Sequence, residues 1–277
     1  MRLGGPIFET IDTPDAWVQA IKKSGYRAAS CPLEPEADDQ TVRAYAEAAR
    51  SADIVIAEVG AWSNPLSDDA DTRQQAIEKC QRGLDLAERI GARCCVNIAG
   101  SRGAQWDGPH PDNLSEETFA MIVATTRHII DAVQPKHAFY TLETMPWIFP
   151  DSPESYLRLM HAIDRPQFGA HLDPVNMINS PSRLFHNAYF LRECFRLLGP
   201  HIVCCHAKDI ALRGKLTVHL DEVRPGQGAL DYTTFLHELN ALDADTPLIL
   251  EHLPNAEEYR LAADYIRGVA RQEGIML

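Results

Sequence analysis

Four side chains that are able to bind a metal ion each close an apolar stretch in the second half of the sequence. The stretch YTLE ends in Glu143, GAHLD in Asp173, VCCH in His206 and LILE in Glu251. Three carboxylates and one imidazole make a ligand set for a divalent ion of intermediate hardness, such as Mn²⁺, Co²⁺, Mg²⁺ or Zn²⁺. Taken one at a time, such a glutamate is usually a solvated loop residue and such a histidine a satisfied core residue. The hypothesis of a metal site therefore depends on all four side chains meeting.

Short apolar stretches alternate with segments of helical spacing along the whole chain. Eight stretches are predicted as strands, each followed by a helical candidate: residues 2–8, 26–33, 53–62, 93–101, 137–144, 167–173, 201–209 and 247–253. This pattern is typical of an α/β fold, a single-domain (β/α)8 TIM barrel spanning residues 1–277. The alternative, a doubly wound open sheet, needs a glycine-rich phosphate turn that GGPIFETIDTPD lacks. In a barrel the carboxyl ends of the strands meet at one face, so the four side chains can converge.

Local signals place the ends of several helices. Helix starts are predicted at Thr13 with Pro14, at Ser115 and at Ser152, because Ser and Thr cap helices and Pro is tolerated in the first turn. Gly25, Gly91 and Gly199 each precede a predicted strand and are expected to end helices in the left-handed conformation.

The period of two along a strand predicts which side chains point into the barrel. In VCCH, we expect Val203 and Cys205 to face the helices and Cys204 and His206 to face inward. Glu58 on the third strand is a further candidate, but the alternation in IAEVGAW leaves its direction open.

Five further residues are candidates for substrate contact. Asn176 and Lys208 follow two of the metal-binding candidates and are expected toward the mouth, although Lys208 could equally pair with an acid. His171 points the same way as Asp173 one layer deeper, where it contacts a ligand or fills the core. Arg224 is a candidate for contact with a substrate oxygen, as is Arg213. Trp106 lies in the loop after the fourth strand and either stacks on a sugar ring or belongs to a plain surface loop; Trp62 and Trp147 are similarly placed.

Composition narrows the classes of partner. The formal charge of −13, from 39 acidic and 26 basic residues, opposes binding to nucleic acid. The seven cysteines show no CxxC spacing and are predicted to be buried thiols in a reducing compartment. No stretch reaches the roughly 18 apolar residues of a membrane span, and the amino terminus lacks an apolar signal core. We expect a cytoplasmic protein that binds a small molecule and has no membrane or nucleic-acid partner. Assembly into a homo-oligomer is left open.

In these motifs the sequence resembles the sugar phosphate isomerase/epimerase superfamily, the xylose isomerase-like TIM barrels, over essentially its whole length. The resemblance is carried by YTLETMPW, GAHLDPVNM, HAKD, RPGQGALDY and PLILEHL. It implies that Glu143, Asp173, His206 and Glu251 bind one divalent metal, with Mn²⁺ the first expectation. It also implies that Glu143 and Glu251 act as an acid/base pair. The implied activity is an isomerase or epimerase of a sugar, keto-sugar or cyclitol that works through an enediolate.

Two departures from the pattern keep other activities open. The ketose 3-epimerases of this superfamily carry a histidine and an arginine where this chain has Asn176 and Ala211, so a free ketohexose is in doubt as the substrate. Residues 210–223 form a longer segment that is expected to be a lid or a subunit contact. The alternatives are a metal-dependent lyase, either inosose dehydratase-like or C-glycoside-cleaving, a metal-binding sensor without turnover, and a DNA repair enzyme, which the acidic charge opposes.

Overall fold

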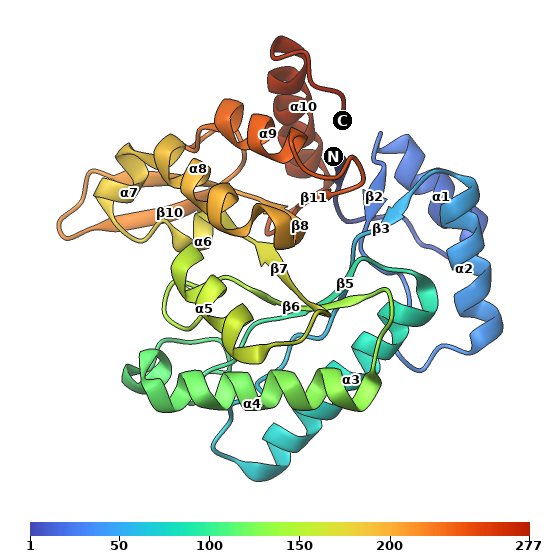
Figure 1. Cartoon of the computed structure of the whole chain (residues 1–277). Helices are drawn as coiled ribbons and strands as arrows, with labels where there is room; N and C mark the ends of the chain where they lie inside the picture. The colour runs from blue at the N-terminus through green and yellow to red at the C-terminus, as the bar shows by residue number, and fades with distance from the viewer.

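Nine parallel strands form one continuous sheet in the computed structural model of residues 1–277, in the order β3-β2-β1-β11-β8-β7-β6-β5-β4 (Figure 1). The two ends of this order, β3 (Val55–Ile56) and β4 (Glu58–Gly60), are halves of one predicted strand that is interrupted at Ala57. The Ala57 amide donates to the carbonyl of Ala29 at 2.8 Å, and its own carbonyl accepts from Cys94 at 3.3 Å. The sheet therefore closes through Ala57, and the predicted eight-stranded TIM barrel is confirmed.

The remaining barrel strands are shorter than predicted but occur at the expected places: β1 (Arg2–Gly4), β2 (Ala28–Ala29), β5 (Cys94–Asn97), β6 (Phe139–Glu143), β7 (Phe168–Leu172), β8 (Ile202–Ala207) and β11 (Pro247–Leu250). The α-helices surround them in chain order: α1 (Pro14–Lys23), α2 (Asp39–Ser51), α3 (Ala70–Ile90), α4 (Glu116–Val133), α5 (Pro153–Ile163), α6 (Pro174–Met177), α7 (Pro181–Phe185), α8 (Asn187–Leu198), α9 (Tyr232–Asn240) and α10 (Ala256–Gln272). Short 3₁₀ turns, η1 (Pro111–Leu114) and η2 (Gly199–His201), precede α4 and β8. None of the helices combines the length and the apolar character that crossing a membrane requires.

The helix ends follow the sequence signals with one exception. The side chains of Thr13, Ser115 and Ser152 cap α1, α4 and α5 as predicted, each accepting a bond from a backbone amide in the first turn. Gly25 and Gly91 adopt positive φ angles of 67° and 77°, also as predicted. The prediction for Gly199 is wrong, because its φ of −42° is right-handed and the chain continues into η2. Pro200 follows it, and the fixed φ of proline suits this right-handed turn.

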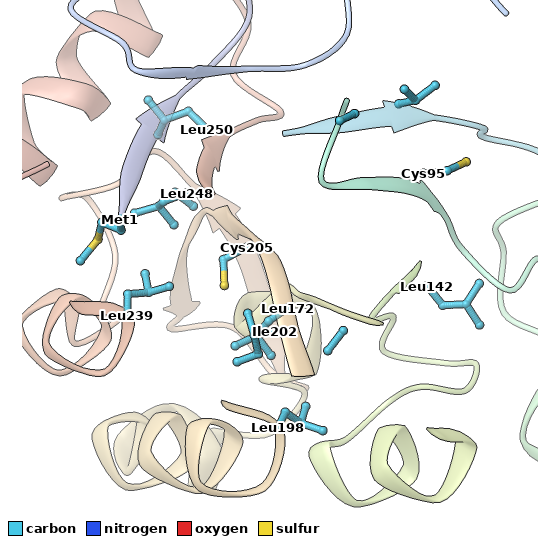
Figure 2. Packing of buried hydrophobic residues seen from close by; sticks show 14 of the residues in the cluster. Met1, Cys95, Leu142, Leu172, Leu198, Ile202, Cys205, Leu239, Leu248 and Leu250 are labelled. Carbon is cyan, nitrogen blue, oxygen red and sulfur yellow. The ribbon is translucent and has the colours of Figure 1, made fainter. Parts of the chain in front are cut away.

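Buried side chains form a large cluster of 63 residues and a small one of 7. Figure 2 shows part of the large cluster, in which Cys205 packs near Leu172 and Ile202 as a small apolar side chain. The prediction that Val203 faces the helices is wrong. Val203 belongs with Cys204 to the small cluster, which contains no helix residue. The pairing of β7 with β8 passes from Ile202 directly to Cys204, and the bulge turns Val203 out of the strict alternation. All seven cysteines are free thiols.

The segment after β8 forms an antiparallel hairpin of β9 (Asp209–Arg213) and β10 (His219–Val223), which projects from the barrel at the left of Figure 1. Its tip is exposed, including Leu216 and Val218. Its base lies against the strand ends, because Glu222 approaches the ammonium of Lys208 at 3.7 Å. The predicted insertion is therefore an ordered hairpin that packs on the core through Ile210 and directs Glu222 toward the strand ends.

Asp209 joins this hairpin to the loop before α9. Its Oδ1 accepts hydrogen bonds from the amides of Ile210 and Leu230 at 2.8 and 2.9 Å, and its Oδ2 accepts from Gly226 and Gly228 at 2.9 and 3.0 Å. Burial raises the pKa of this carboxyl, although the four amides oppose the shift. One buried side chain thus holds the loop that begins at Arg224.

Replacing Asp209 with asparagine is expected to destabilise the protein by roughly 3 kcal/mol, because the new amide nitrogen would face two backbone donors and leave them unpaired. Urea unfolding at neutral pH measures the change. Asp221→Asn is the control, since Asp221 is exposed on the same hairpin and pairs only with Arg213 there. A loss in Asp209→Asn no larger than in this control would contradict the assignment.

Candidate metal centre and substrate cavity

The four predicted metal ligands meet at the carboxyl ends of four neighbouring strands. Glu143 ends β6, and Asp173 follows β7 as the N-cap residue of α6. His206 lies near the end of β8, and Glu251 follows β11. One ligand atom from each lies within 4.8 Å of all the others. The Nδ1 atom of His206 is 3.1 Å from Glu143 Oε1, 2.8 Å from Glu251 Oε1 and 3.9 Å from Asp173 Oδ2. The sequence-predicted cluster therefore exists as a compact group.

Two oxygens of this group are suited to a cation. Asp173 Oδ2 and Glu251 Oε1 are buried and accept no well-directed hydrogen bond. The ammonium of Lys208 lies 2.7 and 2.5 Å from them, but at angles that do not make hydrogen bonds. Lys208 thus offsets the charge of these buried oxygens without using their lone pairs, which stay available to a metal ion. Three carboxylates and one imidazole nitrogen fit a divalent metal of the Mn²⁺, Co²⁺, Mg²⁺ or Zn²⁺ kind.

Opposing electrostatic effects act on these groups. Burial raises the pKa of Asp173 to about 7, helped by its acidic neighbours and opposed by Lys208. For Glu143 burial acts in the same direction, but His206 and Lys208 outweigh it and hold its pKa well below the ordinary value. Burial would lower the pKa of His206, yet Glu251 and Glu143 raise it well above its usual range. Two cationic side chains, Lys208 and protonated His206, thus offset the carboxylates of the metal-free protein.

A cavity of about 570 Å³ opens above this cluster. Its walls carry aromatic and apolar side chains with a few polar groups: Trp62, Ile98, Trp106, Asp107, Glu143, Met145, Pro146, Trp147, Asn176, Glu251, His252 and Tyr259. Of the four ligands only Glu143 and Glu251 line it, whereas Asp173 and His206 are 0% and 1% exposed. No lysine or arginine is among the lining residues. The two glutamates are therefore the ligands that a bound molecule can reach.

The structure brings two of the five substrate candidates to this cavity. Trp106 lines it, together with Trp62 and Trp147. The indole of Trp147 donates to the carbonyl of Asp107 at 2.8 Å, which ties two of the rim loops together. Asn176 also lines the cavity, and its amide donates to Glu143 Oε1 at 3.0 Å. Its side chain thereby orients one of the two glutamates that face the cavity.

The other three candidates lie elsewhere. For Lys208 the structure agrees with the second of the two alternatives, pairing with an acid: the side chain is 2% exposed and its ammonium contacts the ligand carboxylates. Arg224 lies outside the lining and pairs with Glu258 of α10 at 2.9 Å, and Arg213 pairs with Asp221 in the hairpin. His171 is fully buried, and its Nε2 lies 2.8 Å from Glu58 Oε2. None of these side chains contacts the cavity.

Sequence reasoning left the direction of one candidate, Glu58, open and did not name His252. Glu58 points into the barrel and is 6% exposed, and the available signal was an ionisable residue in the middle of an apolar strand. His252 directly follows Glu251, lines the cavity and has a left-handed φ of 57°. A non-glycine residue in this conformation is uncommon and often marks a functional site. Its Nδ1 lies 3.2 Å from Glu222 Oε2 of the hairpin.

Comparisons with known proteins agree with this architecture. Solved structures with similar folds include the probable 3-DHS dehydratase of Bacillus anthracis, 20% identical, with a TM-score of 0.70 over 97% of this chain and 98% of that one. The 3-keto-D-glucoside 4-epimerase of E. coli is 14% identical, with a TM-score of 0.68 over 97% and 99% of the two chains. Endonuclease IV of Thermus thermophilus is 14% identical, with a TM-score of 0.71 over 98% and 100%. At these identities the likeness concerns the fold alone.

The search of curated proteins finds no match to the chain. The family described as "Xylose isomerase-like TIM barrel" matches residues 18–269, which is most of the sequence. This match agrees with the closed barrel. The chain therefore belongs to the xylose isomerase-like TIM barrel family.

Proposed function

We propose that the protein is a divalent-metal-dependent isomerase or epimerase of a neutral sugar, keto-sugar or cyclitol. The observation that carries this proposal is the double placement of Glu143 and Glu251. Both carboxylates belong to the metal cluster, and both also line the cavity. An acid/base pair must reach the substrate as well as be held in a fixed geometry. A site that only bound a metal would not need two carboxylates exposed to the cavity.

The chain's own residues have distinct roles in this proposal. Glu143, Asp173, His206 and Glu251 would hold the metal, which would supply Lewis-acid stabilisation of negative charge on a substrate oxygen. One glutamate removes a proton from the carbon beside the carbonyl, and the other returns a proton. Asn176 orients Glu143 through its 3.0 Å hydrogen bond. Burial would raise the pKa of Glu251, but His206 lowers it overall, which favours the basic form.

A lyase that shares this first proton abstraction is the second candidate. His252 beside Glu251 is the observation that favours it, because it lines the cavity and its hydrogen bond to Glu222 raises the pKa of the imidazole. A protonated imidazole at that place can donate a proton to a leaving hydroxyl group. The similarity in fold to a dehydratase as well as to an epimerase is compatible with either reaction.

Incubation in D₂O separates these candidates. A panel of ketoses and keto-cyclitols is incubated with the Mn²⁺-loaded protein and followed by NMR and mass spectrometry. Deuterium uptake that accompanies conversion to an isomer or epimer supports the first proposal, whereas loss of water or of an aglycone supports the lyase. Absence of exchange on every compound in the presence of bound Mn²⁺ would favour the sensor hypothesis over both.

The charge of the lining predicts a preference for uncharged substrates. Asp107, Glu143 and Glu251 contribute carboxylates, and no cationic Lys or Arg faces a phosphate group. We expect any keto-sugar that exchanges to show a kcat/KM at least about tenfold above that of its phosphate monoester, because the lining offers no lysine or arginine to pair with a phosphate dianion. Steady-state kinetics on the matched pair test this. A higher kcat/KM for the ester would contradict the prediction, and the same electrostatics oppose an abasic-DNA substrate.

A further inference from the structure

A second buried cluster lies beneath the metal centre, inside the barrel. Glu58 of β4 directs one oxygen, Oε2, at two histidines: it is 2.8 Å from His171 Nε2 and 3.5 Å from His206 Nε2. All three side chains are buried. We propose that Glu58 is a positioning residue that holds the His206 ring so that its Nδ1 faces the three ligand carboxylates. This inference rests on the proposed metal site, and no step of catalysis is assigned to Glu58 itself.

The two nitrogens of His206 face different partners. Nδ1 lies 3.1 Å and 2.8 Å from the carboxylates of Glu143 and Glu251, on the side of the metal cluster. Nε2 faces Glu58 on the opposite side of the ring. An ionised carboxylate only accepts hydrogen bonds, so Glu58 favours a proton on Nε2. When a metal ion displaces the proton of Nδ1, a proton kept on Nε2 leaves Nδ1 as the nitrogen that can bind the ion, which is how outer carboxylates orient metal-binding histidines.

The surroundings restrict the movement of Glu58. Its other oxygen, Oε1, accepts from the hydroxyl of Ser30 at 3.2 Å, and Cys204 Sγ lies 3.7 Å from Oε2. The rings of His171 and His206 pack edge to face, with centroids 4.2 Å apart. Burial by itself would raise the pKa of Glu58, but the two histidines outweigh it and lower the pKa. The carboxylate thus links β4 to the neighbouring strands β7 and β8, from which β4 lies apart in the sheet order.

A purely structural role is the competing explanation, because the shorter contact of Glu58 is with His171. A structural role would change stability without a particular effect on the metal. A positioning role affects the binding of Mn²⁺ and the proton on His206 Nε2. These two quantities therefore separate the explanations.

The test uses Glu58→Gln, which keeps the volume but removes one acceptor oxygen, with Ser30→Ala as the matched control. Ser30→Ala removes a hydrogen bond from the same carboxylate without touching the oxygen that faces the histidines. Isothermal titration with Mn²⁺ gives the affinity. Proton–nitrogen NMR of the metal-free and Mg²⁺-loaded protein with ¹⁵N-labelled histidine reports the Nε2–H protons, and thermal unfolding reports the fold.

For Glu58→Gln we expect the Mn²⁺ affinity to fall roughly 10- to 100-fold and the protected Nε2–H signal of His206 to be lost or shifted. Ser30→Ala is expected to stay within about threefold of the parent affinity. Unchanged affinity in Glu58→Gln, an equal loss in Ser30→Ala, or an unchanged Nε2–H signal would each overturn the proposal. If the parent protein binds no divalent metal, the proposed function fails, while the metal-free Nε2–H signal still decides whether Glu58 engages His206.

Discussion

Replacing either Glu143 or Glu251 with glutamine is expected to lower solvent-deuterium exchange into the substrate by roughly 10²- to 10⁴-fold, the usual contribution of a general acid or base. The amide is nearly isosteric and its oxygen can still approach a metal, but it cannot accept the proton. Both side chains line the cavity and lie within 3.1 Å of the same His206 nitrogen. The exchange rate is measured by NMR at Mn²⁺ concentrations that saturate each variant, so that weaker metal binding is not mistaken for lost chemistry.

Glu257→Gln is the control for these variants. Glu257 is exposed on α10, pairs with Arg260 at 2.7 Å and is outside the cavity lining. Its replacement is expected to leave the exchange rate within about twofold of the parent, because surface ion pairs contribute little. Exchange at the parent rate in metal-saturated Glu251→Gln and Glu143→Gln would refute the acid/base assignment.

Replacing Lys208 with methionine is expected to destabilise the metal-free protein by roughly 3–5 kcal/mol, the cost of removing one partner from a buried ionic group. The ammonium lies 2.7 Å from Asp173 and 2.5 Å from Glu251, and it is almost completely buried. Burial would lower the pKa of Lys208, but these carboxylates raise it well above its ordinary value. Without it, only the imidazoles of His206 and of His252, which lies 3.7 Å from Glu251, face the carboxylate cluster as possible cations.

Added metal is expected to recover much of this loss. A divalent ion that binds only the folded state stabilises it, and in Lys208→Met it meets no competing ammonium at the same oxygens. The rise in Tm on adding Mn²⁺ should therefore exceed that of the parent. Thermal unfolding in EDTA and in excess Mn²⁺ measures both quantities, with the exposed Lys136→Met as the control. A metal-free Lys208→Met as stable as this control would refute the proposed charge balance.

Much of the architecture was readable from the chain because it depends on local periodicity. The alternation of apolar strands with capped helices predicted the barrel, and helix starts such as Ser115 and Ser152 were found where their hydroxyls indicated. The convergence of the four metal-binding candidates was also predictable. Parallel strands in a barrel present their carboxyl ends at one face, so polar residues at the ends of successive strands become neighbours without any further information.

The partners of long or strand-centred side chains were decided only by the tertiary structure. The sequence does not determine whether a flexible lysine reaches the mouth or pairs with an acid. In the folded barrel Lys208 points inward, because its ammonium pairs with the buried carboxylate of Asp173. Arg224 pairs with Glu258 on α10, more than thirty residues further along the chain. A bulge in the pairing of β7 with β8 reverses the expected direction of Val203. Glu58 meets His206 across the barrel from a distant strand. The sequence by itself determines which strands end in polar side chains, because strand periodicity is local. The partner of each long or strand-centred side chain depends on reach, burial and strand register, which exist only once the barrel has closed.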